Sequence, residues 1–276
     1  MKIFIDSATV SEIKKADSYG ILDGVTTNPS LIKRAVDSLK KAGKNIDMQR
    51  YIEDILKTAK GTPVSLEVIG ADADTIIAEG KALFRRFNSI ANNVVIKVPV
   101  NPAFKADDTT HFDGIKAIKA LSAQGIPINC TLIFTPEQAI LAAKAGAMYV
   151  SPFAGRVDDD LRKISGIEFD KADYYPSEGM VRGESIISDN GVVSGIDLVS
   201  QIAHIFAAYD IKTEILAASL RNPRQVREAA FAGADIATLP LSVIETLLHH
   251  HKTFEGMKSF TDDIVPAYSG MLKELR

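Results

Sequence analysis

The sequence predicts an α/β fold: a (β/α)8 TIM barrel with an inserted loop after the sixth strand and an extra C-terminal helix. Two observations carry this prediction. Short strand-like segments alternate with amphipathic helical stretches eight times, and one helix–strand unit occurs twice. The 276 residues show no long break in composition, so we expect a single barrel domain over residues 1–276. Eight alternations favour a closed barrel over an open, doubly wound sheet.

The predicted strands share an apolar, β-branched composition that is typical of parallel strands buried on both faces. They are residues 2–6, 24–28, 64–69, 94–100, 128–134, 149–153, 214–219 and 235–240. Helical periodicity lies between them, for example from Asp113 to Gly125, where Ile115, Ile118 and Leu121 recur at intervals of three. We therefore expect a strand followed by a helix in each unit.

The internal repeat supports the same architecture. TPEQAILAAKAGAMYVS, which begins at Thr135, aligns without gaps with NPRQVREAAFAGADIAT, which begins at Asn222. Each copy has an N-cap residue, a proline for the first helical position, a glutamine for a capping box and a glycine for a left-handed C-cap. These are Thr135, Pro136, Gln138 and Gly146 in one copy, and Asn222, Pro223, Gln225 and Gly233 in the other. Chance similarity between alanine-rich helices is the alternative explanation.

Two segments depart from the regular alternation. Residues 157–193 are polar and loop-like, with three consecutive aspartates at 158–160, and we interpret them as an insertion after the sixth strand. Such a loop lies on the face where barrels build active sites, so it acts either as a lid or as a simple surface excursion. The segment FEGMKSFTDDIVPAYSGMLKELR at the C-terminus predicts a further helix that docks on the barrel or on a neighbouring subunit.

Composition narrows the class of partner. A formal net charge of −3 gives no reason to expect nucleic acid or an acidic membrane surface, and no apolar run approaches the ~20 residues of a membrane span. The N-terminal MKIFIDSATV reaches an acid at Asp6 before any signal-peptide core forms, which favours the cytoplasm. The single cysteine, Cys130, excludes an internal disulfide. Consecutive histidines at 249–251 would point in different directions on a helix, and we expect no metal site.

Polar residues gather where the predicted strands end. They are Asp6, Thr26, Asn28, Glu67, Lys97, Asn129, Thr131, Ser151, Phe153, Ser219 and Arg221. Several form pairs two residues apart, so that both members face the same side of their strand. Each one taken singly has a structural explanation, such as capping a helix or extending along the barrel rim. Two acids and a lysine on separate strands are costly to bury without a function, so a shared polar pocket explains the set better.

A lysine within an apolar strand has a specific chemical use. Burial disfavours the charged ammonium form, and a neutral amine at Lys97 can attack a ketone to form a Schiff base. The resulting iminium withdraws electrons during C–C cleavage, which also requires acid–base groups for substrate and water protons. Asp6 and Glu67 are available for those roles.

The sequence resembles transaldolases and fructose-6-phosphate aldolases. The resemblance covers nearly the whole chain and rests on FIDSA, DGVTTNPSLI, VSLEV, IKVPV, NCTLIF, YVSPFAGRVDD, ILAASLRNP and AGADIATLP. It implies that Lys97 forms the Schiff base, that Asp6 takes the proton of the C4 hydroxyl, and that Glu67 and Thr131 handle a catalytic water. It also implies that Thr26, Asn28, Asn129 and Ser151 hold the dihydroxyacetone part. Arg156, Ser219 and Arg221 would bind the terminal phosphate. No cofactor is implied.

Two positions separate the activities within this family. Transaldolases have glutamate and phenylalanine where Glu67 and Phe153 stand, whereas aldolases that release free dihydroxyacetone have glutamine and tyrosine. We therefore expect a transaldolase that acts on sugar phosphates, with a fructose-6-phosphate aldolase and a non-catalytic sugar-phosphate-binding barrel as the alternatives. The resemblance also implies a homo-oligomer.

Some residues depart from the family pattern. Ser7 stands where threonine is usual, and residues 101–111 lengthen the loop after the lysine strand. Within the insertion, Arg162, Lys163 or Arg182 are candidates for contact with an anionic substrate, with solvated surface charges as the alternative.

Overall fold

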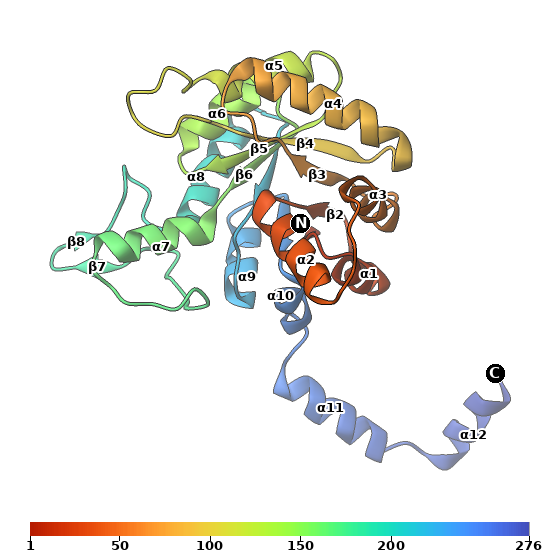
Figure 1. Ribbon diagram of the computed structural model, residues 1–276. Helices are drawn as coiled ribbons and strands as arrows, with labels where there is room; N and C mark the ends of the chain where they lie inside the picture. Colours follow the sequence, from red (N-terminus) through yellow and green to blue (C-terminus); the bar gives the residue numbers. More distant parts are fainter. Residues whose placement is uncertain (276) are drawn as a thin grey trace.

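The computed structural model describes residues 1–275, and within them eight parallel strands close into a barrel (Figure 1). In barrel order the strands are β1 (Lys2–Asp6), β2 (Gly24–Thr26), β3 (Val64–Glu67), β4 (Val94–Pro99), β5 (Ile128–Ile133), β6 (Tyr149–Pro152), β9 (Glu214–Ala217) and β10 (Ile236–Leu239), which pairs with β1. The predicted fold class is confirmed.

Helices surround this barrel. They are α1 (Val10–Ser18), α2 (Pro29–Lys41), α3 (Met48–Thr58), α4 (Ala73–Ala91), α5 (Asp113–Ser122), α6 (Pro136–Ala145), α7 (Ala154–Ile164), α8 (Gly195–Ala208), α9 (Pro223–Phe231) and α10 (Leu241–Thr246). Their inward faces pack on the outside of the strands in one continuous apolar core. A second cluster, which includes Phe4, Val95, Tyr149, Leu216 and Ile236, fills the barrel interior, so the barrel is a packed core rather than a pore.

The repeated units begin and end largely as predicted. Thr135 and Asn222 are N-caps whose side chains accept hydrogen bonds from the backbone N–H groups of Gln138 and Gln225. Thr135 and Gln138 form the complete capping box. Both glutamines also accept from the backbone N–H of the residue before the N-cap, Gln138 from Phe134 at 2.8 Å and Gln225 from Arg221 at 2.9 Å. Each repeat therefore uses its glutamine to fix the end of the loop between a strand and its helix.

The predicted insertion needs a correction at its start. Residues 157–164 belong to α7, and the irregular part runs from 165 to 193 between α7 and α8, with a small hairpin of β7 (Val181–Arg182) and β8 (Ser185–Ile186). The loop-like prediction was wrong for α7 because Asp158 and Asp159 suggested a solvent-exposed surface, whereas both are buried. The insertion and α7 lie together on one side of the barrel (Figure 1).

The C-terminal segment forms two helices rather than one. They are α11 (His251–Asp262) and α12 (Pro266–Glu274). Pro266 explains the break, because proline cannot continue a helix but fits the first position of a new one. The two helices form an arm that extends away from the barrel (Figure 1), and no residue of either helix within the described chain is buried.

None of the described helices is long and apolar enough to cross a membrane. Residues 1–275 also contain no group of three or more His, Cys, Asp or Glu side chains that could hold a metal ion.

Candidate active site

Strand register brings the predicted acids and the lysine to one end of the barrel. Glu67 on β3 is level with Lys97 on β4, and Lys97 is level with Asn129 on β5. Asp6 on β1 is likewise level with Thr26 on β2. Because parallel strands end on the same face, their C-terminal side chains share one rim, where barrel enzymes place their active sites.

Lys97 lies at the centre of this group. The residue is only 4% exposed, and its Nζ lies 2.9 Å from Glu67 Oε2 and donates to the Thr27 carbonyl at 3.1 Å. The Phe153 ring centroid is 6.0 Å from the same Nζ. A buried amine beside one carboxylate and one carbonyl has a fixed direction and an acceptor for its proton.

Asp6 is the second acid of the site. Burial raises the pKa of its carboxyl above the ordinary value, while the nearby Lys97 charge and a hydrogen bond from Thr26 act in the opposite direction. The Thr26 hydroxyl donates to Asp6 Oδ1 at 2.7 Å. Asp6 is therefore a carboxylate whose affinity for a proton exceeds that of an exposed aspartate.

Hydroxyl and amide groups continue the rim. Ser151 donates to Asn129 Oδ1 at 2.6 Å, and Asn129 Nδ2 donates to Ser65 at 3.1 Å, so the amide has a fixed orientation. Thr131 is fully buried, and its hydroxyl has no hydrogen-bond partner among residues 1–275. Asn28 is the N-cap of α2, where its Oδ1 accepts from the Leu31 N–H at 3.0 Å.

A small cavity of about 90 Å³ lies over these residues. Predicted site residues that line it are Asp6, Thr26, Asn28, Lys97, Ser151, Phe153, Arg156 and Ser219. Glu67 and Asn129 do not line the cavity themselves. Each contacts a residue that does, Glu67 through its ion pair with Lys97 and Asn129 through its hydrogen bond with Ser151. Most of the predicted residues therefore converge on one pocket from separate strands, with Arg156 added from the first turn of α7, whereas Thr131 and Arg221 do not line it.

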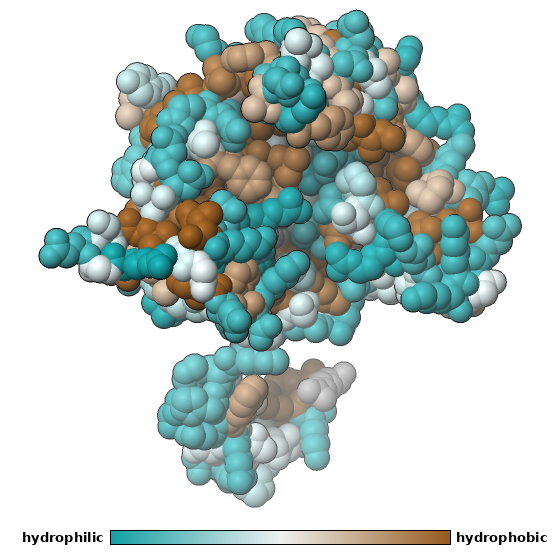
Figure 2. All heavy atoms as spheres, turned by 60° about the vertical axis from the view of Figure 1, so that its left-hand side comes forward, coloured by the Kyte–Doolittle hydropathy of each residue, from teal (hydrophilic) through white to brown (hydrophobic). Residues whose placement is uncertain are grey.

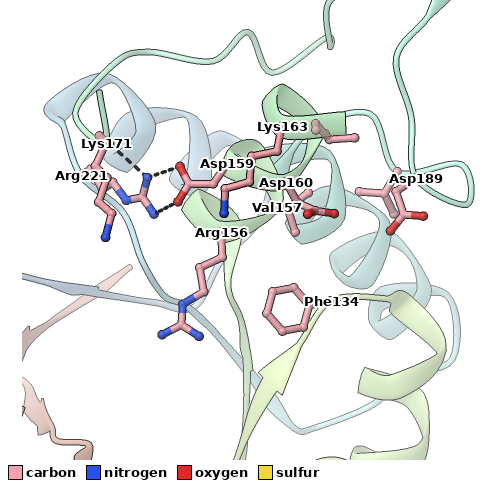
Figure 3. Close-up of a pocket in the computed structure, with 11 residues that line it drawn as sticks. Phe134, Arg156, Val157, Asp159, Asp160, Lys163, Lys171, Asp189 and Arg221 are labelled. Atoms are coloured by element: carbon pink, nitrogen blue, oxygen red, sulfur yellow. Dashed lines mark hydrogen bonds and ion pairs between the residues drawn. The ribbon is translucent and has the colours of Figure 1, made fainter. Parts of the chain in front are cut away.

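A larger cavity of about 520 Å³ adjoins the first through Arg156, which lines both (Figure 3). The guanidinium of Arg156 lies 4.8 Å from the Phe153 ring centroid. Figure 3 shows Asp159 facing Arg221, with hydrogen bonds of 2.5 and 2.7 Å from Nη1 and Nη2 to its two oxygens. Nη1 also donates to the Lys171 carbonyl at 3.1 Å, and Nη2 is 3.5 Å from Ser219 Oγ. Arg221 is thus held by α7 and by the insertion.

Ser219 has a strained backbone at the junction of the two cavities. Its φ of +63° lies in the left-handed region that non-glycine residues rarely adopt. Its carbonyl approaches Gly155 of α7 so closely that a Cβ there would lie 2.1 Å from the oxygen. Glycine at 155 therefore lets the start of α7 pack against the loop that carries Ser219 and Arg221.

The charged residues of the insertion differ in their placement. Arg162 is buried, with its guanidinium 5.0 Å from the ring centroids of both Phe169 and Tyr175, and it donates to the Asp173 carbonyl. It anchors the insertion and does not line the cavities described above. Lys163 lines the larger cavity, and Arg182 donates to the Ser165 carbonyl on the surface.

Sequence reasoning missed three residues of this region. Asp158 is buried and accepts from the Gly195 N–H at 2.7 Å and from Gln225 Nε2 at 2.9 Å, and Asp159 holds Arg221. Thr238 on β10 lines the small cavity, with its hydroxyl 2.6 Å from that of Thr26. The signal for Thr238 was present, because it stands near the end of the eighth strand, as the other site residues stand near the ends of theirs.

Comparisons of the sequence with curated proteins and with family profiles agree with the resemblance seen in the sequence. Among solved structures, a mandelate oxidase variant superposes with a TM-score of 0.49 at 14% identity, covering 87% of this chain and 65% of that chain. A probable transaldolase of Exiguobacterium sibiricum is 43% identical over 263 residues, covering 95% of this chain and 97% of that protein. Probable transaldolases of Aquifex aeolicus and Thermoplasma volcanium are 41% and 40% identical, each over 95% of this chain and over 96% and 95% of their own lengths. The profile of the Transaldolase/Fructose-6-phosphate aldolase family matches residues 3–275, and the chain therefore belongs to this family.

Proposed function

We propose that the protein is a transaldolase that moves a dihydroxyacetone unit from a ketose phosphate to an aldose phosphate through a Schiff base on Lys97. The observation that carries this proposal is the buried lysine in a polar cavity, with Glu67 at 2.9 Å and the Asp6 carboxylate on the same rim. Membership of the family supports it.

The first half of the reaction forms and cleaves the adduct. The Lys97 amine attacks the ketone carbon, a proton passes to and from Glu67, and loss of water leaves an iminium. Asp6 then takes the proton of the C4 hydroxyl, and the C3–C4 bonding pair moves toward the iminium nitrogen to give an enamine. The aldose phosphate leaves. Attack of the enamine on a second aldose aldehyde, with a proton returned by Asp6, reverses these steps, and hydrolysis frees Lys97.

The raised pKa of Asp6 suits this role. A base that must accept a proton from an alcohol works better when its affinity for protons is higher, provided that it stays ionised at the working pH. Burial supplies the higher affinity, and Lys97 and Thr26 limit the rise of the pKa.

The terminal phosphate belongs at the junction of the two cavities. Arg156 lines both cavities, and Ser219 stands beside it. Most N–H donors of Arg221 are directed at Asp159 and the Lys171 carbonyl, so we assign the direct phosphate contact chiefly to Arg156 and a supporting charge to Arg221.

The pair Glu67 and Phe153 supports transfer rather than release. A carboxylate beside an apolar ring orders water differently from an amide beside a phenol, and slow hydrolysis of the enamine adduct leaves time for an acceptor to bind. An aldolase that releases free dihydroxyacetone is the alternative. Release of glyceraldehyde 3-phosphate from fructose 6-phosphate, with and without erythrose 4-phosphate, separates the two. Turnover that requires the acceptor supports transfer, whereas steady turnover without it contradicts transfer and supports the aldolase.

The lysine assignment has its own test. Borohydride reduction with fructose 6-phosphate should attach a reduced three-carbon unit to the wild type, and Lys97→Ala should abolish the adduct. Lys105→Ala is the matched control, because Lys105 is an exposed lysine in the loop after the same strand, and this variant should be labelled normally. An adduct of unchanged yield in Lys97→Ala would sink the assignment, and no adduct in the wild type would favour a non-catalytic binding barrel.

The proposal extends to assembly and location. The arm of α11 and α12 carries exposed apolar side chains that a neighbouring copy of the chain would cover, so we include a homo-oligomer. We also include the cytoplasm as the site of action, as the sequence predicts.

A further inference from the structure

Three side chains from neighbouring strands form a chain of hydrogen bonds beside the small cavity. Thr238 on β10 lies 2.6 Å from the hydroxyl of Thr26 on β2, and Thr26 donates to Asp6 of β1 at 2.7 Å. The two threonines are 3% and 2% exposed. Strand β1 lies between β10 and β2 in the barrel, so both threonines reach toward the strand that carries the acid.

The number of protons fixes the direction of these bonds. A threonine hydroxyl has one proton to donate, and an ionised carboxylate can only accept. With Asp6 ionised, Thr26 directs its proton to Asp6, and its oxygen must accept from Thr238. Thr238 therefore acts as the first donor in the order Thr238, Thr26, Asp6.

Protonation of Asp6 disturbs or weakens this order. A proton on Oδ2 leaves Oδ1 as an acceptor, but that of a neutral acid, which accepts more weakly than a carboxylate. A proton on Oδ1 makes Asp6 donate to Thr26 and Thr26 donate to Thr238, and the proton of Thr238 then needs a new acceptor. Within residues 1–275, Thr26 is the one hydrogen-bond partner of the Thr238 side chain, so that acceptor must come from the cavity. The hydroxyl chain is thus better satisfied when Asp6 is ionised, and neighbouring hydrogen bonds strengthen one another.

We propose that Thr238 is a positioning residue for Asp6: it holds Thr26 as a donor, and so keeps the Asp6 carboxylate ionised and directed at the substrate. This inference rests on the proposed function, in which Asp6 is the base for the C4 hydroxyl. Other charged groups that act on Asp6 are Lys97 from β4, Arg34 from α2 and Arg156 from α7. Thr238 contributes through hydrogen bonding alone, because it carries no charge.

Two substitutions separate this role from simple packing. Thr238→Val keeps the shape of the side chain and removes the hydroxyl, whereas Thr238→Ser keeps the hydroxyl and removes a methyl group. Thr213→Val is the matched control, because Thr213 precedes β9 at the opposite end of the barrel, where its hydroxyl donates to the Ala147 carbonyl.

The measurement is the pH profile of kcat/KM for the full chain with fructose 6-phosphate and erythrose 4-phosphate. In T238V the acidic limb should move to higher pH by roughly half a unit to one unit, the size expected for loss of one hydrogen bond between neutral groups. T238S should keep the acidic limb of the kcat/KM profile near its wild-type pH, and T213V should leave it unchanged. If T238V does not fold, comparison of T238A with T238S gives the same test.

Borohydride trapping with free dihydroxyacetone distinguishes the two proposals. This ketone has no C4 hydroxyl, so T238V should give a wild-type yield of adduct while its cleavage of fructose 6-phosphate is impaired. Failure to trap the wild type would overturn the proposed function. If the wild type is trapped and turns over normally, the proposed function stands, and the variants then test Thr238 alone. An unshifted acidic limb in T238V, or a T238S variant as impaired as T238V, would overturn the role of Thr238.

Discussion

At the residue scale, Glu67 and Lys97 form the pair on which imine formation depends. Glu67→Gln keeps the side-chain size and removes the charge, so the amide can no longer accept a proton from the amine. We expect imine formation to slow by about 10²- to 10⁴-fold, the usual contribution of a general base. Rapid mixing followed by borohydride quenching measures this rate.

A surface ion pair provides the control for Glu67. Glu53→Gln removes the carboxylate partner of Lys57 on α3, where the two groups are 3.4 Å apart, and it should leave the rate unchanged. Equal rates for Glu67→Gln and the wild type would show that the nearby carboxylate takes no part in proton transfer.

Arg156 is the residue that should distinguish phosphorylated from unphosphorylated donors. Arg156→Gln should raise KM for fructose 6-phosphate by about 10- to 100-fold, because one charge-assisted hydrogen bond to phosphate is lost. The KM for unphosphorylated fructose, which has no phosphate for Arg156 to contact, should change little. Arg182→Gln, on the surface of the insertion, is the control. The assignment of Arg156 to the phosphate fails if KM rises equally for the phosphorylated and the unphosphorylated sugar.

At the element scale, Asp158 joins three helices. It lies on α7, accepts from the first residue of α8 and from Gln225 of α9, and is buried. Burial raises the pKa of its carboxyl to about 6, although hydrogen bonds from Gly195 and Gln225 and the charge of Arg162 act to lower it. The helices are therefore held by a carboxylate that is costly to ionise in place.

This shift predicts how stability depends on pH. The folded-state pKa exceeds the unfolded value, so the contribution of Asp158 to stability is complete below about pH 4 and is lost as the pH rises through 6. The free energy of unfolding of the wild type, minus that of Asp158→Asn, should therefore fall by about 2.5 kcal/mol between pH 4 and pH 7.5. Urea titrations at several pH values measure this difference.

The neighbouring aspartate is the control for that experiment. Asp160 lies on the same helix but is exposed, and the corresponding difference for Asp160→Asn should be nearly constant with pH. A pH-independent difference for Asp158→Asn would contradict a shifted carboxyl at position 158.

At the scale of the whole molecule, the sequence predicted the barrel and most of its rim because these depend on local patterns. The segment predicted as a strand at 94–100 is a strand at Val94–Pro99, and Lys97 lies within it. Their positions near the C-terminal ends of predicted strands were enough to place Asp6 and Lys97 on one rim of the barrel. Helix α7 was missed because its carboxylates are buried by Gly195, Gln225 and Arg221, which are distant in sequence. Thr238 was missed because it acts on Asp6 through its hydrogen bond with Thr26, which lies 212 positions away in the sequence.

The barrel does not explain how the arm of α11 and α12 is stabilised, because none of the described residues of these helices is buried. Phe254, Met257 and Phe260 recur along α11, Tyr268 and Met271 lie on α12, and all of them are at least 47% exposed. Figure 2 shows the arm apart from the barrel, with apolar side chains on its surface. Helices of this length are marginal alone, so a second copy of the chain should cover them. Light scattering should give a multiple of 29.8 kDa for the full chain and a single-chain mass after deletion of 249–276. Deletion of the exposed hairpin 181–186 should leave the assembly intact, and a full chain of single-chain mass would refute this role for the arm.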